Sequence, residues 1–175
     1  MRMNIKKEIS ENNIIILIIP NKKYPVVLED TVKALASAYS KLCYTSLNKP
    51  YDKLLDEFKK SNIDAGKFFF IDCVSEKIST GKNVLYVSSP RALTELNITM
   101  NKLLDTGDIQ LTIFDSLSTL LAYEGSMTVI KFLHSIISAF RTYGSRCIFT
   151  CMKDDVNADT IKDLKMFADK LIEVE

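Results

Sequence analysis

Short apolar runs alternate along the chain with longer segments in which apolar positions recur every three or four residues. The short runs have the length and composition of buried strands. They lie at residues 14–19, 43–47, 67–72, 84–88, 111–115, 146–151 and 170–174. The longer segments have the spacing of amphipathic helices. These predicted helices lie at about residues 28–41, 51–58, 89–106, 126–142 and 157–169.

Strands that alternate with helices of this length predict right-handed crossover connections and a mainly parallel sheet covered on both faces. The sequence therefore predicts an α/β protein with a three-layer αβα sandwich. The chain has 175 residues, of which 47% are hydrophobic and 26% charged, an ordinary composition for one globular domain. We expect that domain at residues 13–175, preceded by a flexible N-terminal arm at residues 1–12.

The charge and the N-terminal sequence narrow the classes of partner. The formal net charge is +1, from 23 basic and 22 acidic residues, whereas a dedicated nucleic-acid-binding protein usually has a basic excess. The apolar run at 14–19 is too short to span a bilayer. Glu8 and Glu11 lie where a signal peptide would be basic. We expect a cytoplasmic protein without nucleic-acid or membrane partners.

Four cysteines lie in predicted strands or at their ends, and none forms a Cys-x-x-Cys pair. They are Cys43, Cys73, Cys147 and Cys151. Cysteine is among the most buried residue types, so the favoured role is core packing. A metal site and a disulfide are the alternatives.

The apolar run at 111–115 ends in a carboxylate, Asp115, followed at once by the hydroxyl of Ser116. The carboxyl end of a strand in an open α/β sheet faces the crevice where ligands bind. Asp115 is therefore placed to hold a metal–phosphate group through a water molecule. The alternative is that Asp115 caps the helix or turn that follows, because aspartate side chains accept backbone N–H bonds there.

The first strand is not followed by a phosphate-binding loop. Such a loop needs glycines, so that backbone N–H groups can close on phosphate oxygens, and a Lys followed by Ser or Thr. The first glycine of this chain is Gly66. Lys22 and Lys23 supply positive charge after the strand, but Tyr24 is bulky and Pro25 lacks an N–H donor. Either lysine is a candidate for residual anion binding, with a solvated turn as the alternative.

Four segments, taken in order, resemble the RecA/KaiC-like ATPase domain across roughly residues 13–175. They are 43–54, similar to the second strand and helix of that family; 69–75, similar to its Asp-x-x-Ser segment; 111–121, similar to its Walker B strand; and 167–172, similar to its closing strand. The family usually has a catalytic Glu where this chain has Asn48. A carboxamide cannot take a proton from water at neutral pH.

The resemblance implies the RecA-like fold with a degenerate site, and ATP hydrolysis is not expected. We therefore expect a pseudo-ATPase that serves as a protein-interaction or regulatory scaffold, through self-association or a protein partner. The alternative is a non-hydrolysing nucleotide- or phosphate-binding regulatory domain, with Asp115, Ser116 and Lys22 or Lys23 lining its pocket. No cofactor or metal is expected, and residual binding of Mg–nucleotide is left open.

Three further residues were candidates for chemistry. His134 is the only histidine, which excludes a multi-histidine metal site, and we expect it at the boundary of a buried helix face. Arg141 and Arg146 could reach a neighbouring subunit as arginine fingers. Surface solvation is the favoured role of both.

Overall fold

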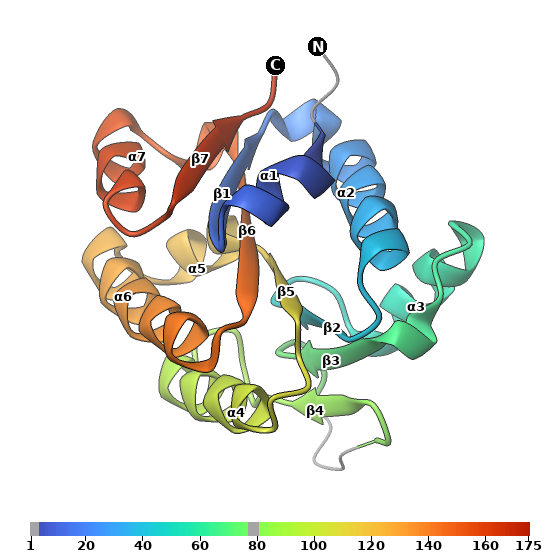
Figure 1. Ribbon diagram of the computed structural model, residues 1–175. Helices are drawn as coiled ribbons and strands as arrows, with labels where there is room; N and C mark the ends of the chain where they lie inside the picture. The colour runs from blue at the N-terminus through green and yellow to red at the C-terminus, as the bar shows by residue number, and fades with distance from the viewer. Residues whose placement is uncertain (1–3, 77–80) are drawn as a thin grey trace.

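The core of the protein is a seven-stranded sheet in which all the strand pairings are parallel (Figure 1). The computed structural model describes residues 4–76 and 81–175. The strand order is β4-β3-β2-β5-β6-β1-β7. The strands are β1 (Ile14–Ile19), β2 (Leu42–Ser46), β3 (Phe68–Asp72), β4 (Val84–Tyr86), β5 (Leu111–Asp115), β6 (Arg146–Met152) and β7 (Lys170–Glu173).

Helices cover both faces of the sheet and bury a separate core on each side. One face carries α4 (Leu93–Asp105), α5 (Leu117–Tyr123), α6 (Ser126–Tyr143) and α7 (Ala158–Lys165). The other carries α1 (Ile5–Glu11), α2 (Tyr24–Ala38) and α3 (Tyr51–Lys60). Short 3₁₀ helices lie at η1 (Asn21–Lys23), η2 (Ala65–Lys67) and η3 (Lys153–Asp155). The predicted αβα sandwich with a parallel sheet is confirmed.

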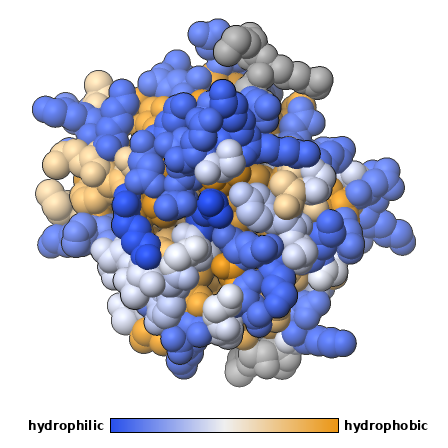
Figure 2. Space-filling model, viewed as in Figure 1, coloured by the Kyte–Doolittle hydropathy of each residue, from blue (hydrophilic) through white to orange (hydrophobic). Residues whose placement is uncertain are grey.

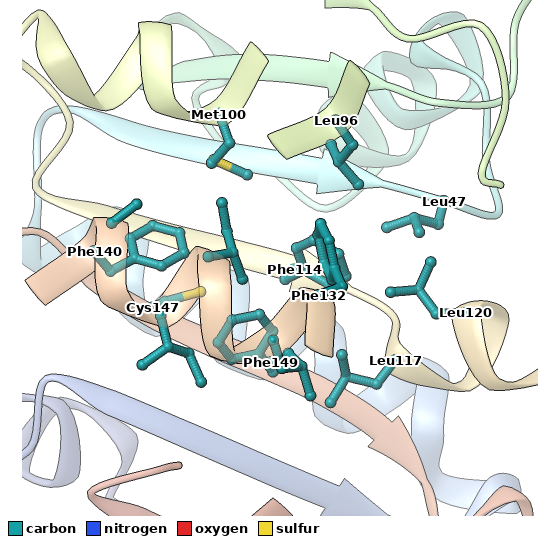
Figure 3. Close-up of a cluster of buried hydrophobic side chains, with 14 of the residues drawn as sticks. Leu47, Leu96, Met100, Phe114, Leu117, Leu120, Phe132, Phe140, Cys147 and Phe149 are labelled. Carbon is teal, nitrogen blue, oxygen red and sulfur yellow. The ribbon is translucent and has the colours of Figure 1, made fainter. Parts of the chain in front are cut away.

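Alternation along each strand supplies the two cores. In β1, Ile14, Ile16 and Ile18 enter one core, whereas Ile15, Leu17 and Ile19 enter the other. Figure 3 shows the first of these cores, where Phe114, Phe132 and Phe149 lie among aliphatic side chains from the helices. On the face shown in Figure 2, hydrophilic residues cover most of the surface and hydrophobic residues show between them. Both sheet faces are thus withdrawn from water, as the continuous apolar runs predict.

The N-terminal segment differs from the flexible arm expected at residues 1–12. Its described part forms α1, whose Ile5 and Ile9 are buried in the core beside α2. Lys170 Nζ of β7 lies 2.6 Å from Glu8 Oε2 of α1. Ile5 and Ile9, one helical turn apart, bury one face of this segment in the core.

The start of α2 also differs from the prediction, in a way that matters for the site. The helix begins at Tyr24, four residues before the predicted start, with Pro25 in its first turn. Proline is well suited to that position because its missing N–H would have had no partner within the helix. The early start carries the Tyr24 ring into the interior, where only 7% of its surface is exposed.

The cysteines pack as predicted. All four are free thiols and all four are buried. Within residues 4–76 and 81–175, no group of three or more His, Cys, Asp or Glu side chains could hold a metal ion. None of the described helices combines the length and apolar character needed to cross a membrane.

Candidate functional site

The carboxylate of Asp115 lies buried at the end of β5 and accepts three hydrogen bonds from its own chain. The Tyr24 hydroxyl donates to Oδ1 at 2.6 Å, and the Asn48 amide donates to the same oxygen at 3.2 Å. The Tyr44 hydroxyl donates to Oδ2 at 2.7 Å. A carboxylate offers about four acceptor positions, so most of its capacity is filled. The three donors are side chains from distant segments, so these bonds do not show Asp115 capping the backbone of the helix that follows.

The parallel register explains how the donors reach Asp115. Tyr44 of β2 pairs with Ile113 of β5, two residues before Asp115, and Ser46 pairs with Asp115 itself. Tyr24 does not come from the sheet but from the first turn of α2. Asn48 follows the end of β2 and is the only exposed member of the three. Sheet and helix together place three neutral donors around one charge.

The Tyr24 hydroxyl has two possible acceptors, the Asp115 carboxylate and the hydroxyl of Thr150 in β6. The two hydroxyl oxygens lie 2.6 Å apart, and Thr150 Oγ1 also lies 3.1 Å from the Phe114 carbonyl. The single hydrogen of Tyr24 goes to the charged acceptor, Asp115, because bonds to ionised groups are the stronger ones. Thr150 then donates to the Tyr24 oxygen or to the Phe114 carbonyl.

Both tyrosines stay protonated as donors. Burial raises the pKa of the Tyr24 hydroxyl far above its usual range, and the neighbouring charge of Asp115 raises it further. Burial and the same charge also raise the pKa of Tyr44 well above its usual value. The site therefore consists of one buried carboxyl group surrounded by protonated hydroxyl donors and a neutral amide.

The four residues expected to line one nucleotide pocket do not all come together. Ser116 follows Asp115 and is buried, with its Oγ 3.3 Å from Thr119 Oγ1. Lys22 is exposed in η1. Lys23 donates from Nζ to the Glu175 carbonyl at 2.6 Å. Lys23 also lines a cavity of about 890 Å³ bounded by α1, α2 and β7, which is separate from Asp115.

A second cavity, of about 460 Å³, lies over Asp115 between α2 and α3. Its buried walls are apolar and come from Leu28, Val32, Leu54, Phe58 and Ile63. Tyr24, Tyr44, Asn48 and Asp115 supply its polar lining. Charged side chains at its more exposed positions are Glu29, Lys49, Glu57 and Lys60. We call this space the Asp115 cavity.

Asp72, which ends the other apolar run, has a structural role. Its carboxylate accepts backbone bonds from Tyr51, Val74 and Ser75 at 2.8–2.9 Å, and a bond from the Ser75 hydroxyl at 2.6 Å. Burial acts to raise the pKa of Asp72, but the hydrogen bonds from these residues outweigh it and hold the pKa below its usual range. Asp72 thereby joins the start of α3 to the turn after β3.

Of the remaining candidates, Arg141 and His134 make contacts within the chain, whereas the Nε of Arg146 is buried without a hydrogen-bond partner among the described residues. The Arg141 guanidinium lies 2.8 Å from the Asp169 carboxylate and 3.2 Å from the Phe167 carbonyl. Asp169 in turn accepts the backbone N–H groups of Asn13 and Ile14. His134 is exposed, with its ring 5.7 Å from that of Phe167. Arg141 thus ties α6 to the start of β1 and β7, which is a structural role.

Tyr24 and Tyr44 are the site residues that sequence reasoning missed. A detectable signal existed, because a tyrosine within a buried apolar run must find a partner for its hydroxyl. Tyr44 stands in such a run, one strand from Asp115. Tyr24 was expected in a loop, and its inward position follows from the early start of α2.

Comparison with known proteins supports the fold and places the chain in a family. The crystal structure of the flagellar accessory protein FlaH from Methanocaldococcus jannaschii superposes with a TM-score of 0.56 at 16% sequence identity. The match covers 93% of this chain and 71% of that one. A search of curated proteins finds no match. Residues 64–174 match a family of unknown function, DUF7504, and the chain belongs to that family.

Proposed function

We propose that this protein is a RecA/KaiC-like domain that does not hydrolyse ATP and serves as a protein-interaction or regulatory module. The observation that carries the proposal is the occupied carboxylate of Asp115. A Mg²⁺-bound water would have to bond to this carboxylate, and Tyr24, Tyr44 and Asn48 already fill three of its positions.

The connection between β1 and α2 supports the same proposal. Between β1 and α2 the chain offers Pro20, a 3₁₀ turn and Tyr24 instead of a glycine-rich loop. Lys23, one of the two lysines available for a phosphate, is bonded to the Glu175 carbonyl. Asn48 occupies the position expected for a general base, and it donates a hydrogen bond there instead.

A thermal-shift titration tests the loss of nucleotide binding. We expect Mg–ATP, Mg–ADP and Mg–GTP at millimolar concentration to leave the melting temperature unchanged. A ligand at one hundred times its Kd would stabilise the native state by about 2.7 kcal/mol, which is a rise of roughly 5–10 °C for a domain of this size. A rise of that size in the wild type would contradict the proposal.

One observation favours the second candidate, a domain that binds nucleotide or phosphate without hydrolysis. The Asp115 cavity has the volume of a small-molecule site, and Lys49 and Lys60 lie among its lining residues. This candidate predicts a thermal shift with nucleotide that the Asp115→Ala variant loses. A shift that Asp115→Ala retains would place any binding elsewhere on the protein.

The interaction role has a groove of mixed apolar and polar lining as its structural support. Arg91, Leu93, Ile98, Glu124 and Thr128 line a cavity of about 660 Å³ beside the start of α4. Ile98 is 52% exposed. Tyr123 and Met127, which adjoin Glu124 and Thr128 in the sequence, are 52% and 65% exposed. Exposed apolar side chains gathered around a groove are typical of an interaction site.

Gel filtration with light scattering tests this role. We expect the purified protein to self-associate or to retain a protein partner, and Met127→Asp to weaken the association. Met166→Asp is the matched control, because Met166 is 75% exposed and lies at the end of α7. A strict monomer without a co-purifying partner would argue against the interaction role.

A further inference from the structure

We propose that the Asp115 cavity is a binding site for a small organic cation, an aromatic or branched aliphatic body that carries one primary ammonium group. The ammonium would bond to Asp115 Oδ1, and the apolar body would lie between α2 and α3. This inference stands on the geometry of the cavity, and it holds whether or not the domain takes part in an assembly.

The charge of the cavity favours a cation over an anion. Three carboxylates and two ammonium groups lie among its lining residues. Of the charges at the more exposed positions, Lys49 lies 2.7 Å from Glu57, and Glu29 lies 2.5 Å from Lys33 outside the lining, whereas Lys60 is exposed to solvent. Of the three carboxylates in the lining, Asp115 is the one without an ion pair to a described residue, because its three donors are neutral. A buried charge is costly unless a charge of opposite sign compensates it.

Asn48 gives a ligand access to Asp115. It is the exposed member of the three donors, and its bond to Oδ1 is the longest at 3.2 Å, compared with 2.6 and 2.7 Å for the tyrosines. An ammonium that displaced the Asn48 amide would replace a neutral donor with a charged one. Hydrogen bonds between ionised partners are shorter and roughly twice as strong as neutral bonds.

The walls select the body of the ligand. Leu28, Val32, Leu54 and Ile63 are buried aliphatic residues of the lining, and the rings of Tyr44 and Phe58 meet edge to face at 5.7 Å. Small-molecule sites are usually clefts of about 300–1,000 Å³ with apolar walls and a few polar groups. At about 460 Å³, the cavity is much larger than the four-methylene stem of a lysine side chain. A free amine with a compact body therefore fits it better.

Isothermal titration calorimetry with phenethylamine, compared with the neutral isostere 2-phenylethanol, tests the inference. We expect the wild type to bind phenethylamine at millimolar concentration or tighter, and the alcohol at least about tenfold more weakly, as the loss of a bond between ionised partners predicts. Equal binding of the two probes, or no binding of phenethylamine, would overturn the proposal.

Two variants locate the charge that the amine meets. Asp115→Asn keeps the size of the side chain and removes its charge, and we expect at least about tenfold weaker binding of phenethylamine. Asn48→Ala removes the exposed amide that the ammonium would otherwise have to displace from Asp115. We therefore expect this variant to bind phenethylamine about fivefold tighter than the wild type. If Asp115→Asn does not unfold cooperatively, Asn48→Ala decides alone, and unchanged or weaker binding would refute the site.

Discussion

Replacing Tyr24 with phenylalanine removes one oxygen atom from the buried part of the candidate site. The ring keeps its volume, so the substitution leaves no large cavity in the core beneath α2. Asp115 loses its 2.6 Å bond and keeps the bonds from Tyr44 and Asn48. Thr150 keeps the Phe114 carbonyl as an acceptor at 3.1 Å, so the substitution leaves no other hydroxyl without a partner.

The expected cost follows from the type of bond that is lost. A hydrogen bond to a charged group contributes about 1.5–3 kcal/mol, and Tyr24 makes one with the buried Asp115. We therefore expect Tyr24→Phe to lower the free energy of unfolding by about 2 kcal/mol. For a chain of this size that corresponds to a fall of roughly 4–8 °C in melting temperature.

Urea unfolding followed by circular dichroism measures the change, with Tyr123→Phe as the matched control. Tyr123 is 52% exposed, so its variant should stay within about 0.5 kcal/mol of the wild type. The Tyr24→Phe cost should shrink by about 1 kcal/mol in an Asp115→Asn background, because the two side chains are bonded to each other. A Tyr24→Phe variant as stable as the control would refute the bonding scheme at Asp115.

Two further predictions concern pH and the second carboxylate. The pKa values of Tyr24 and Tyr44 are raised in the native state, so above about pH 10 the unfolded chain loses protons that the native chain keeps, and the free energy of unfolding falls. Each tyrosine contributes about 1.4 kcal/mol per pH unit to the slope of the free energy of unfolding. In alkaline urea titrations Tyr24→Phe should remove one such contribution, since the buried cysteines contribute equally to both proteins. Identical slopes for the variant and the wild type would contradict this. Asp72→Ala should cost about 3 kcal/mol in the same assay, because Tyr51, Val74 and Ser75 lose their acceptor. The exposed Asp105→Ala is its control, and equal stability of the two variants would show that Asp72 caps nothing essential.

The fold could be predicted from the sequence because its strands are buried on both faces. Such strands appear as unbroken apolar runs, and those at 14–19 and 111–115 match β1 and β5 at both ends. The ends of elements were less predictable where a mostly polar segment contains a few apolar side chains that are buried in the fold. Ile5 and Ile9 turn the expected arm into α1, and only the tertiary contact with α2 reveals this.

The sequence indicated Asp115 and Asn48 as site residues, whereas Tyr24 and Tyr44 were not found. Asp115 could be found because a single carboxylate closes an apolar run at the carboxyl end of a strand. Its partners Tyr24 and Asn48 lie 91 and 67 residues away along the chain, and Tyr44 lies 71 residues away. No local pattern encodes such distances; they follow from the strand order, which brings β2 beside β5.

The stability of the fold does not by itself account for a charge at position 115. Removing a carboxylate from water costs several kcal/mol, and replacing a buried ionic group with apolar residues of similar volume is often neutral or stabilising. The three donors offset that cost without supplying a positive charge. Under the two proposals made above, the carboxylate is either left over from a metal–nucleotide site or completed by a cationic ligand. Titration with phenethylamine separates the two, because only the second explanation requires binding that depends on Asp115.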